Sequence, residues 1–293
     1  MAVLGVRPLA ALFLVRIFII QHDCGHYSFF RSRRANNVTG FFCGLLTLTP
    51  YTSWRRQHAG HHGVWNDLDR RETGADIYSS CLTTEEYLAL SRRKRWEYRA
   101  ARHPVVANLV LPPLIFFVLY RLPFDMPRNW KRERRGVYLT NIALVGLLGS
   151  LGLVLGFGQV ALVQVPVMIL ASIIGVWLFS VQHRSEKAQW FRHEQWDAQA
   201  ASLQGSTFLR LPGPLRWFTG NIGYHHVHHL NPRIPNYRLR DCHAALSDLR
   251  EVPQLSFRDA MRALWFVLWD ERLGKMVTIR EMKREQLPSR AAA

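Results

Sequence analysis

The chain has 293 residues, a formal charge of +17 and 48% hydrophobic residues. Its apolar residues gather in long blocks, and its arginines and lysines collect just outside those blocks, as in the cytoplasmic loops of membrane proteins. This distribution argues against a basic nucleic-acid-binding protein. The four cysteines form no CxxC pair, which argues against a disulfide framework and against a thiolate cluster.

The first apolar block, residues 1–21, is predicted to cross the membrane, although Arg7 and Arg16 interrupt it. An arginine near the centre of a membrane helix costs about 2.5 to 3.5 kcal/mol on insertion scales, but Arg16 is close enough to the polar end to snorkel. A cleaved signal peptide is the alternative. Because no small-residue cleavage site follows Ile20, we expect a helix that delivers His22 to the cytoplasmic side.

Two further apolar segments do not have the form of an ordinary membrane span. The segment 39–51 is shorter than the roughly 20 residues that are needed to cross the hydrocarbon core, which predicts a re-entrant or interfacial segment. Residues 104–120 carry Pro112 and Pro113 in the middle, and proline inside a helix breaks it. We therefore expect a re-entrant hairpin or an interfacial segment that is interrupted at these prolines.

Residues 137–157 and 159–182 contain no charged side chain, and each is long enough to span the membrane. They are predicted to go out and return, so that His183 lies on the same side as the earlier histidines. Residues 184–293 are polar and are expected to form a cytoplasmic helical cap, with an amphipathic helix over about 255–285 that covers the site. The fold class predicted is an all-α integral membrane protein with a single domain over residues 1–293.

Nine histidines lie in four short clusters at the edges of apolar stretches. Their spacing within clusters is i, i+3 or i+4, so a helix would place the imidazoles on one face. Imidazole suits iron, zinc, copper and nickel, and nine nitrogen donors exceed the six positions of a single first-row ion. The sequence therefore predicts a site for two metal ions, with the ligands His22, His26, His58, His61, His62, His183, His225, His228 and His229.

The clusters have recognisable motifs and neighbours. In the two HxxHH motifs, residues i and i+3 are expected to share one metal-facing stripe, and i+4 supplies a third donor. Asp23 can accept an imidazole N–H and so fix the tautomer of a ligand. Three more residues are candidates for contacting the ligands: Asn221, His226 and His193. Alternatively, Asn221 occupies a turn, His226 is merely buried, and His193 is an interfacial side chain.

The motifs HDCGH, HxxHH and HxxHH, in this order, resemble those of the integral-membrane fatty acid desaturases. The resemblance covers nearly the whole chain. Several further stretches are similar to the omega-6, or delta-12, acyl-lipid branch: residues 48–62, 175–183 (GVWLFSVQH), 205–206 with 211–212, 221–230, and 233–239 (RIPNYRL).

The resemblance implies a non-haem di-iron centre held by the nine histidines. Such a centre uses O₂ and two electrons to remove two hydrogens from adjacent methylenes of an acyl chain. Unactivated C–H bonds require a strong oxidant that side chains do not supply, which favours a redox metal independently. The expected partners are an acyl lipid substrate, O₂, membrane lipids, and a separate electron donor that is ferredoxin-like or cytochrome b5-like.

Other functions stay open at this point. Alkane and carotenoid hydroxylases use related histidine motifs, and a non-enzymatic membrane protein could bind or carry metal through the same residues. The predicted spans offer few polar side chains for a metal conduit. His225 stands where front-end desaturases typically carry glutamine, which argues against that branch. The donor set by itself does not distinguish iron from zinc, manganese or copper.

One departure from the resembled family concerns the beginning of the chain. In that family another membrane helix usually precedes the one that carries HDCGH, whereas 21 residues precede His22 here. The expectation is that either the family's first helix is missing from this sequence or the natural chain starts further upstream. An odd number of crossings would then place the N-terminus outside.

Overall fold

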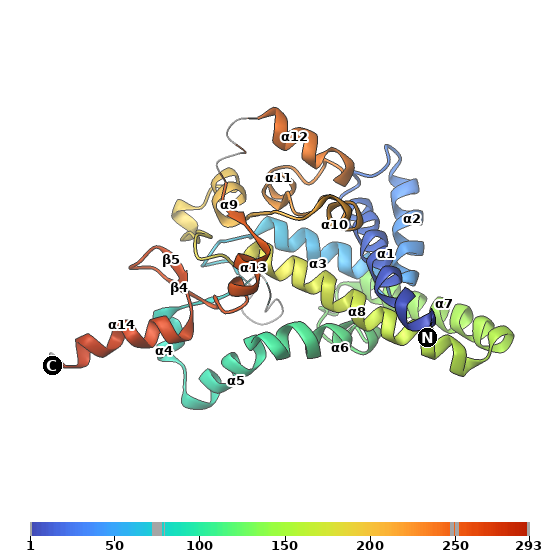
Figure 1. The fold of residues 1–293 in the computed structure, drawn as a ribbon, viewed down its shortest axis with the longest axis horizontal. Helices are drawn as coiled ribbons and strands as arrows, with labels where there is room; N and C mark the ends of the chain where they lie inside the picture. Colours follow the sequence, from blue (N-terminus) through green and yellow to red (C-terminus); the bar gives the residue numbers. More distant parts are fainter. Residues whose placement is uncertain (1, 72–77, 79, 247–248, 250–251, 292–293) are drawn as a thin grey trace.

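The computed structural model describes residues 2–71, 78, 80–246, 249 and 252–291 of the chain. Helices make up most of this structure, as predicted, and short elements surround a few long helices (Figure 1). Five strands of two or three residues add a feature that the all-α prediction did not include.

Three helices are long and apolar enough to cross a membrane: α1 (Ala2–Gly25), α7 (Lys131–Leu155) and α8 (Phe157–His183). They correspond to the three predicted spans. α8 contacts both α1 and α7, so the three helices form one bundle. α1 continues past its predicted end at residue 21 and therefore carries His22 in its last turn.

The segment predicted to be re-entrant or interfacial at residues 39–51 contains the end of α2 (Arg33–Leu46) and the start of α3 (Tyr51–Gly63). α2 packs against α1. The Tyr51 hydroxyl donates a hydrogen bond of 2.8 Å to the carbonyl of Cys24, and a Cβ on Gly40 would overlap the Tyr51 ring. The first contact fixes the start of α3 beside the end of α1, and the second fixes it against α2.

Residues 104–120 contain a bend, but the bend is not at the predicted prolines. α5 (Arg92–Arg102) meets the helical run 106–121 at an angle of 53°, next to Pro104. Pro112 and Pro113 instead occupy the first turn of α6, where a missing backbone N–H does not interrupt the helix. The run consists of a π-helical turn (Val106–Val110), α6 (Leu111–Phe117) and a 3₁₀ turn (Leu119–Arg121).

The part of the chain after α8 forms short elements that pack against the long helices, and α10 and α13 contact α1 and α8 respectively. The connection between α3 and α5 contains β1 (Leu82–Thr83) and α4 (Thr84–Ala89). The elements after α8 are α9 (Ala198–Gly205), β2 (Phe208–Leu209), α10 (Gly213–Phe218), α11 (His225–Leu230), α12 (Leu239–Ala245), β3 (Gln254–Leu255), α13 (Phe257–Ala263), β4 (Leu268–Asp270), β5 (Lys275–Val277) and α14 (Ile279–Ala291), with 3₁₀ turns at His193–Gln195 and Asn236–Arg238.

The single amphipathic helix predicted over residues 255–285 is wrong. A hairpin of β4 and β5 separates α13 from α14, and Gly274 in its turn has a φ of 60°. All three residues of β4 are buried, so both faces of this strand are enclosed. A helix with one apolar face does not provide that arrangement. β4 pairs in parallel with β1, and β2 pairs in parallel with β3.

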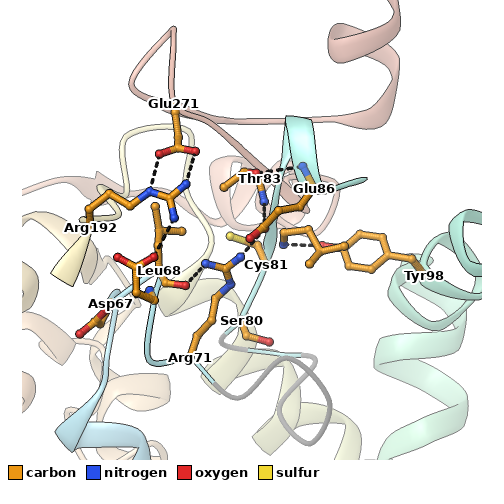
Figure 2. A network of polar contacts seen from close by, with 12 residues as sticks. Asp67, Leu68, Arg71, Ser80, Cys81, Thr83, Glu86, Tyr98, Arg192 and Glu271 are labelled. Atoms are coloured by element: carbon orange, nitrogen blue, oxygen red, sulfur yellow. Dashed lines mark hydrogen bonds and ion pairs between the residues drawn. The ribbon is translucent and has the colours of Figure 1, made fainter. Parts of the chain in front are cut away.

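A network of ion pairs ties the segment after α3 to the hairpin and to α4 (Figure 2). Arg192 donates to both carboxylate oxygens of Glu271, at 2.9 and 2.7 Å, and to Asp69 at 2.7 Å. Arg71, whose side chain is buried, pairs with Glu86. A guanidinium that holds a carboxylate through two bonds fixes its orientation as well as its position. The network therefore anchors the chain that leaves the histidine-bearing helix α3.

Candidate metal centre

The four histidine clusters meet at one place in the fold. The last turn of α1, the helix α3, the last residue of α8 and the helix α11 all lie there, and their imidazole rings form a continuous set of contacts. All nine predicted ligands are in this set: His22, His26, His58, His61, His62, His183, His225, His228 and His229.

The first group comprises five histidines, each with one ring nitrogen within 4.8 Å of all the others. The Nε2 atom of His62 lies 3.3 Å from that of His58 and 3.0 Å from that of His228. The Nε2 atom of His26 is buried and has no hydrogen-bond partner among the described residues. The members of this group are His22, His26, His58, His62 and His228.

The second group comprises His61, His183 and His229, which meet the same distance criterion. His225 adjoins this group. Its Nε2 atom lies 3.0 Å from that of His183 and 3.1 Å from that of His229. With His225 the second group offers four imidazoles, so the structure has two neighbouring places that could each hold a metal ion.

Helices α3 and α11 contribute to both groups because of their helical periodicity. Residue i+4 lies about 40° around the helix axis from residue i, while i+3 lies about 60° away on the opposite side. His58 and His62 accordingly share the first group, and His61 joins the second. The expectation that i and i+3 share a stripe is therefore wrong for both HxxHH motifs, since His225 and His229 also pair at i+4.

Burial favours the neutral form of several of these imidazoles. It lowers the pKa of His58, His62 and His228 well below the ordinary value, and the neighbouring histidines lower it further. The same holds for the pKa of His225 and His229. A neutral imidazole has one N–H and one lone pair, so several nitrogens that converge at about 3 Å cannot all be satisfied by each other. A cation at each place would satisfy them, and a set of neutral imidazoles fits a first-row transition metal.

Asp23 contacts a predicted ligand, as the sequence suggested. Its Oδ1 atom lies 3.2 Å from Nδ1 of His22. Its Oδ2 atom accepts hydrogen bonds from the backbone N–H and from Nδ2 of Asn236, at 2.6 and 2.8 Å. Asp23 thus orients the His22 ring and leaves Nε2 as the nitrogen available to a metal.

The other three candidates for contacting the ligands belong to neither group. The Nε2 atom of the buried His226 lies 3.0 Å from Nδ1 of His243. The side chain of His193 is 42% exposed, and its Nδ1 atom lies 2.8 Å from Oδ2 of Asp67. Asn221 occupies a turn with a φ of 57°, and its amide donates to the carbonyl of Asn236.

Two tryptophans and one asparagine complete the surroundings without having been assigned a role from the sequence. Trp54 stacks on His58 with ring centroids 4.8 Å apart, and the ring centroid of Trp65 is 3.9 Å from that of His183. Trp54 precedes His58 by one helical turn, so helical spacing could have identified it. Asn236 holds Asp23 from 213 residues away, and no local pattern indicates that contact.

The amino-acid sequence matches the family model described as fatty acid desaturase over residues 1–259. The chain belongs to the fatty acid desaturase family. This membership confirms the resemblance of the histidine motifs, and it places the protein in a family whose named members are oxidoreductases.

Several named desaturases are similar to this chain. A fatty acid desaturase of Bacillus subtilis (strain 168) is 42% identical over 280 residues, which are 96% of this chain and 78% of that protein. The sn-1 acyl-lipid omega-3 desaturase (ferredoxin) of Synechocystis sp. is 27% identical over 80% of this chain and 64% of that desaturase. The sn-1 oleoyl-lipid 12-desaturase of Picosynechococcus sp. is 25% identical over 80% of this chain and 65% of that protein. The chain therefore spans slightly less than two thirds of the two cyanobacterial proteins.

Proposed function

We propose that this protein is an O₂-dependent membrane desaturase that introduces a cis double bond into a lipid-linked acyl chain, using a non-haem di-iron centre. One observation carries the proposal. Two neighbouring groups of histidine nitrogens converge where two apolar helices end, in a chain of the fatty acid desaturase family. Related membrane hydroxylases and metal-binding proteins remain as outcomes that the experiment below distinguishes.

When bound, two iron ions would supply the oxidising power that unactivated methylenes require. The chain's own residues would hold, orient and enclose them. Asp23 would fix the tautomer of His22, and the burial of the rings would keep bulk water out. One ion would be held by His22, His26, His58, His62 and His228, and the other by His61, His183, His225 and His229.

The proposed reaction converts two adjacent CH₂ groups and O₂, with two electrons and two protons, into a CH=CH unit and two molecules of water. The two C–H bonds supply two of the four electrons that O₂ takes up. A separate donor must supply the other two. The Synechocystis relative is named for ferredoxin, which supports a ferredoxin-like donor, and a cytochrome b5-like donor would deliver the same electrons.

The proposed substrate is an acyl lipid, and the proposed regiochemistry is of the delta-12 (omega-6) type. Relatives named as acyl-lipid desaturases support the lipid carrier. A relative named for the omega-3 position and one named for the 12 position have nearly the same identity to this chain, 27% and 25%. The position of the double bond must therefore be determined from the product. The arginine-rich segments beside the spans support placing the metal centre on the cytoplasmic side.

The test is expression in a host that makes oleate but no polyunsaturated lipid, together with a ferredoxin and its reductase. Fatty acids of the total lipid are then profiled for the wild type, for His61→Ala and for His103→Ala. We expect a new diene with the wild type and with His103→Ala, since His103 belongs to neither histidine group. We expect no diene with His61→Ala.

The other outcomes would contradict the proposal. Hydroxylated fatty acids that depend on His61 would identify a hydroxylase. A protein that inserts, binds iron and receives electrons but forms no new product would indicate a metal-binding role. A diene at a position other than delta-12 would confirm a desaturase and replace the proposed regiochemistry.

A further inference from the structure

Arg16 is a charged residue inside an apolar helix, and the metal centre does not use it. It lies within the candidate span Gly5–Gly25, six residues before His22. An ionisable residue in a membrane helix is costly to bury and is usually functional. Arg16 therefore calls for a structural explanation.

The guanidinium of Arg16 is held by α10. It donates to the carbonyl of Trp217 and lies 4.2 Å from the centroid of the indole ring. Phe13, one turn earlier on α1, makes edge contacts with the rings of Trp217 and Phe218. These contacts place α10 beside α1, as Figure 1 also shows, and they hold the Arg16 side chain in one position.

Arg16 lines a cavity of about 490 Å³ together with Arg216 and Arg240. Asp241 is the acidic residue in the lining, and it is paired with Arg238 outside the cavity, at 3.4 Å. In the part of the chain that the structure describes, no carboxylate lies within ion-pair distance of the three arginines. The cavity therefore has an excess of positive charge and is suited to an anion.

The position of the cavity indicates the direction from which an anion would come. Val6, Leu9 and Phe13 are exposed and precede Arg16 by ten, seven and three residues, so they form one stripe on α1 that leads to Arg16. Trp217, half exposed, lies at the end of this stripe, where membrane proteins carry aromatic side chains at the lipid–water boundary. A ligand with an apolar tail along α1 would bring its head to the arginines.

The cavity is also joined to the metal centre. Asn236 lies in its lining and donates both its backbone N–H and its amide to Asp23. Asp23 in turn contacts His22. The anion site and the first histidine group thus share a rigid connection of two side chains, which would set the position of a bound head group relative to the metals.

We propose that this cavity binds the phosphate of a membrane phospholipid whose tail lies along α1. The site lies outside the proposed metal centre, so the inference goes beyond the proposed function. Arginine is suited to the role because its planar fork of N–H donors matches two phosphate oxygens. Coenzyme A also carries phosphates, but it would arrive from water, whereas the exposed apolar stripe on a candidate membrane span suits a lipid tail.

The test uses the full-length protein in detergent and measures binding of dihexanoyl phosphatidylglycerol, below its micelle concentration, by calorimetry. We expect Arg16→Gln and Arg216→Gln each to weaken binding about tenfold, as the loss of one charge-assisted hydrogen bond would. Arg240→Gln changes an exposed side chain and is expected to weaken binding without any risk of misfolding. The control is Arg258→Gln, an exposed arginine of α13 outside the cavity, which we expect to bind like the wild type.

Competition binding with inorganic phosphate and with coenzyme A distinguishes other ligands, and the molar mass of the protein in detergent shows whether a second copy occupies this face. Inorganic phosphate that binds as tightly as the lipid would show a simple anion site, and tighter binding of coenzyme A would show a site for a water-soluble phosphate ligand. Either result would overturn the proposal. So would unchanged lipid binding in all three variants, or a wild-type dimer that the variants dissociate, because a second copy would then occupy this face.

The binding experiment is independent of desaturation. Lipid binding that depends on the arginines, in a protein that forms no double bond, would leave the cavity assignment standing and remove the proposed function. Conversely, wild type and Arg16→Gln could form a diene at the same lipid concentration while neither shows arginine-dependent binding. That result would leave the proposed function standing and remove the cavity assignment.

Discussion

The Nε2 atoms of His62 and His228 lie 3.0 Å apart, although 166 residues separate them in the chain. Both belong to the first histidine group, and the two helices that carry them, α3 and α11, also supply the second group. When both rings carry their proton on Nδ1, the two Nε2 lone pairs face each other at this distance, and a cation bound by both would offset their repulsion. The pair is therefore the most direct test of the two-metal arrangement.

Replacing His62 by alanine is expected to remove about one iron per chain and to abolish desaturation, because the first group loses its most central nitrogen. His183→Ala should remove the other iron. The measurement is the iron content of purified protein by mass spectrometry, alongside the fatty-acid profile. Both variants retaining two irons would contradict the proposed ligand set.

His193→Ala is the matched control for those variants. His193 follows His183 closely in the sequence, but its ring pairs with Asp67 and is partly exposed. We expect an unchanged iron content and a modest loss of stability, because the buried Asp67 loses one partner but still accepts hydrogen bonds from the backbone N–H groups of Asp69 and Arg70. Loss of iron in this variant would mean that His193 reaches the metal centre after all.

Removing the metal with a chelator should destabilise the protein, and the loss should grow in acid. Burial holds the pKa of His58, His62 and His228 well below the ordinary value of 6.5. Below about pH 6.5 the unfolded chain takes up protons that the folded, metal-free chain does not, so the free energy of unfolding falls. Thermal unfolding of the chelated protein in detergent, compared at about pH 8 and about pH 5.5, tests this. Equal melting temperatures at both values would refute it.

Asp23→Asn should weaken metal binding about 10- to 100-fold while the fold is retained. The amide would present one oxygen where the carboxylate presents two, so it cannot serve both His22 and Asn236. The measurement is a titration of the metal-free protein with Fe(II) under nitrogen. Glu97→Gln, which removes an exposed carboxylate that pairs with Arg93 on α5, should bind as the wild type does.

Gly205→Ala should lower the stability by about 1 to 3 kcal/mol, because a Cβ at this position would overlap the side-chain amide of Asn66. Asn66 itself donates to the carbonyl of Gln189, so it has little room to move. Gly175→Ala in α8 is the control, since a Cβ there would meet no atom within 4 Å among the described residues, apart from its own stretch of helix. The melting temperature in detergent should fall with the first substitution only.

The sequence by itself determined the features that depend on neighbours along the chain. Three apolar runs of sufficient length predicted α1, α7 and α8, because the thickness of a bilayer translates directly into helix length. The nine histidines could be chosen as a set, since their spacing at helical intervals and their place at apolar edges are both local properties. The contact of Asp23 with His22 was predictable for the same reason.

Only the tertiary structure decided which histidines lie close enough together to hold the same metal ion. His61 and His62 are adjacent in sequence but join different groups, because the packing of α3 between the other helices gives each of its faces a different partner. The same packing turns His226 toward His243 and brings Asn236 to Asp23. Contacts between residues this far apart depend on how the helices pack, and the sequence pattern of a single helix carries no information about its neighbours.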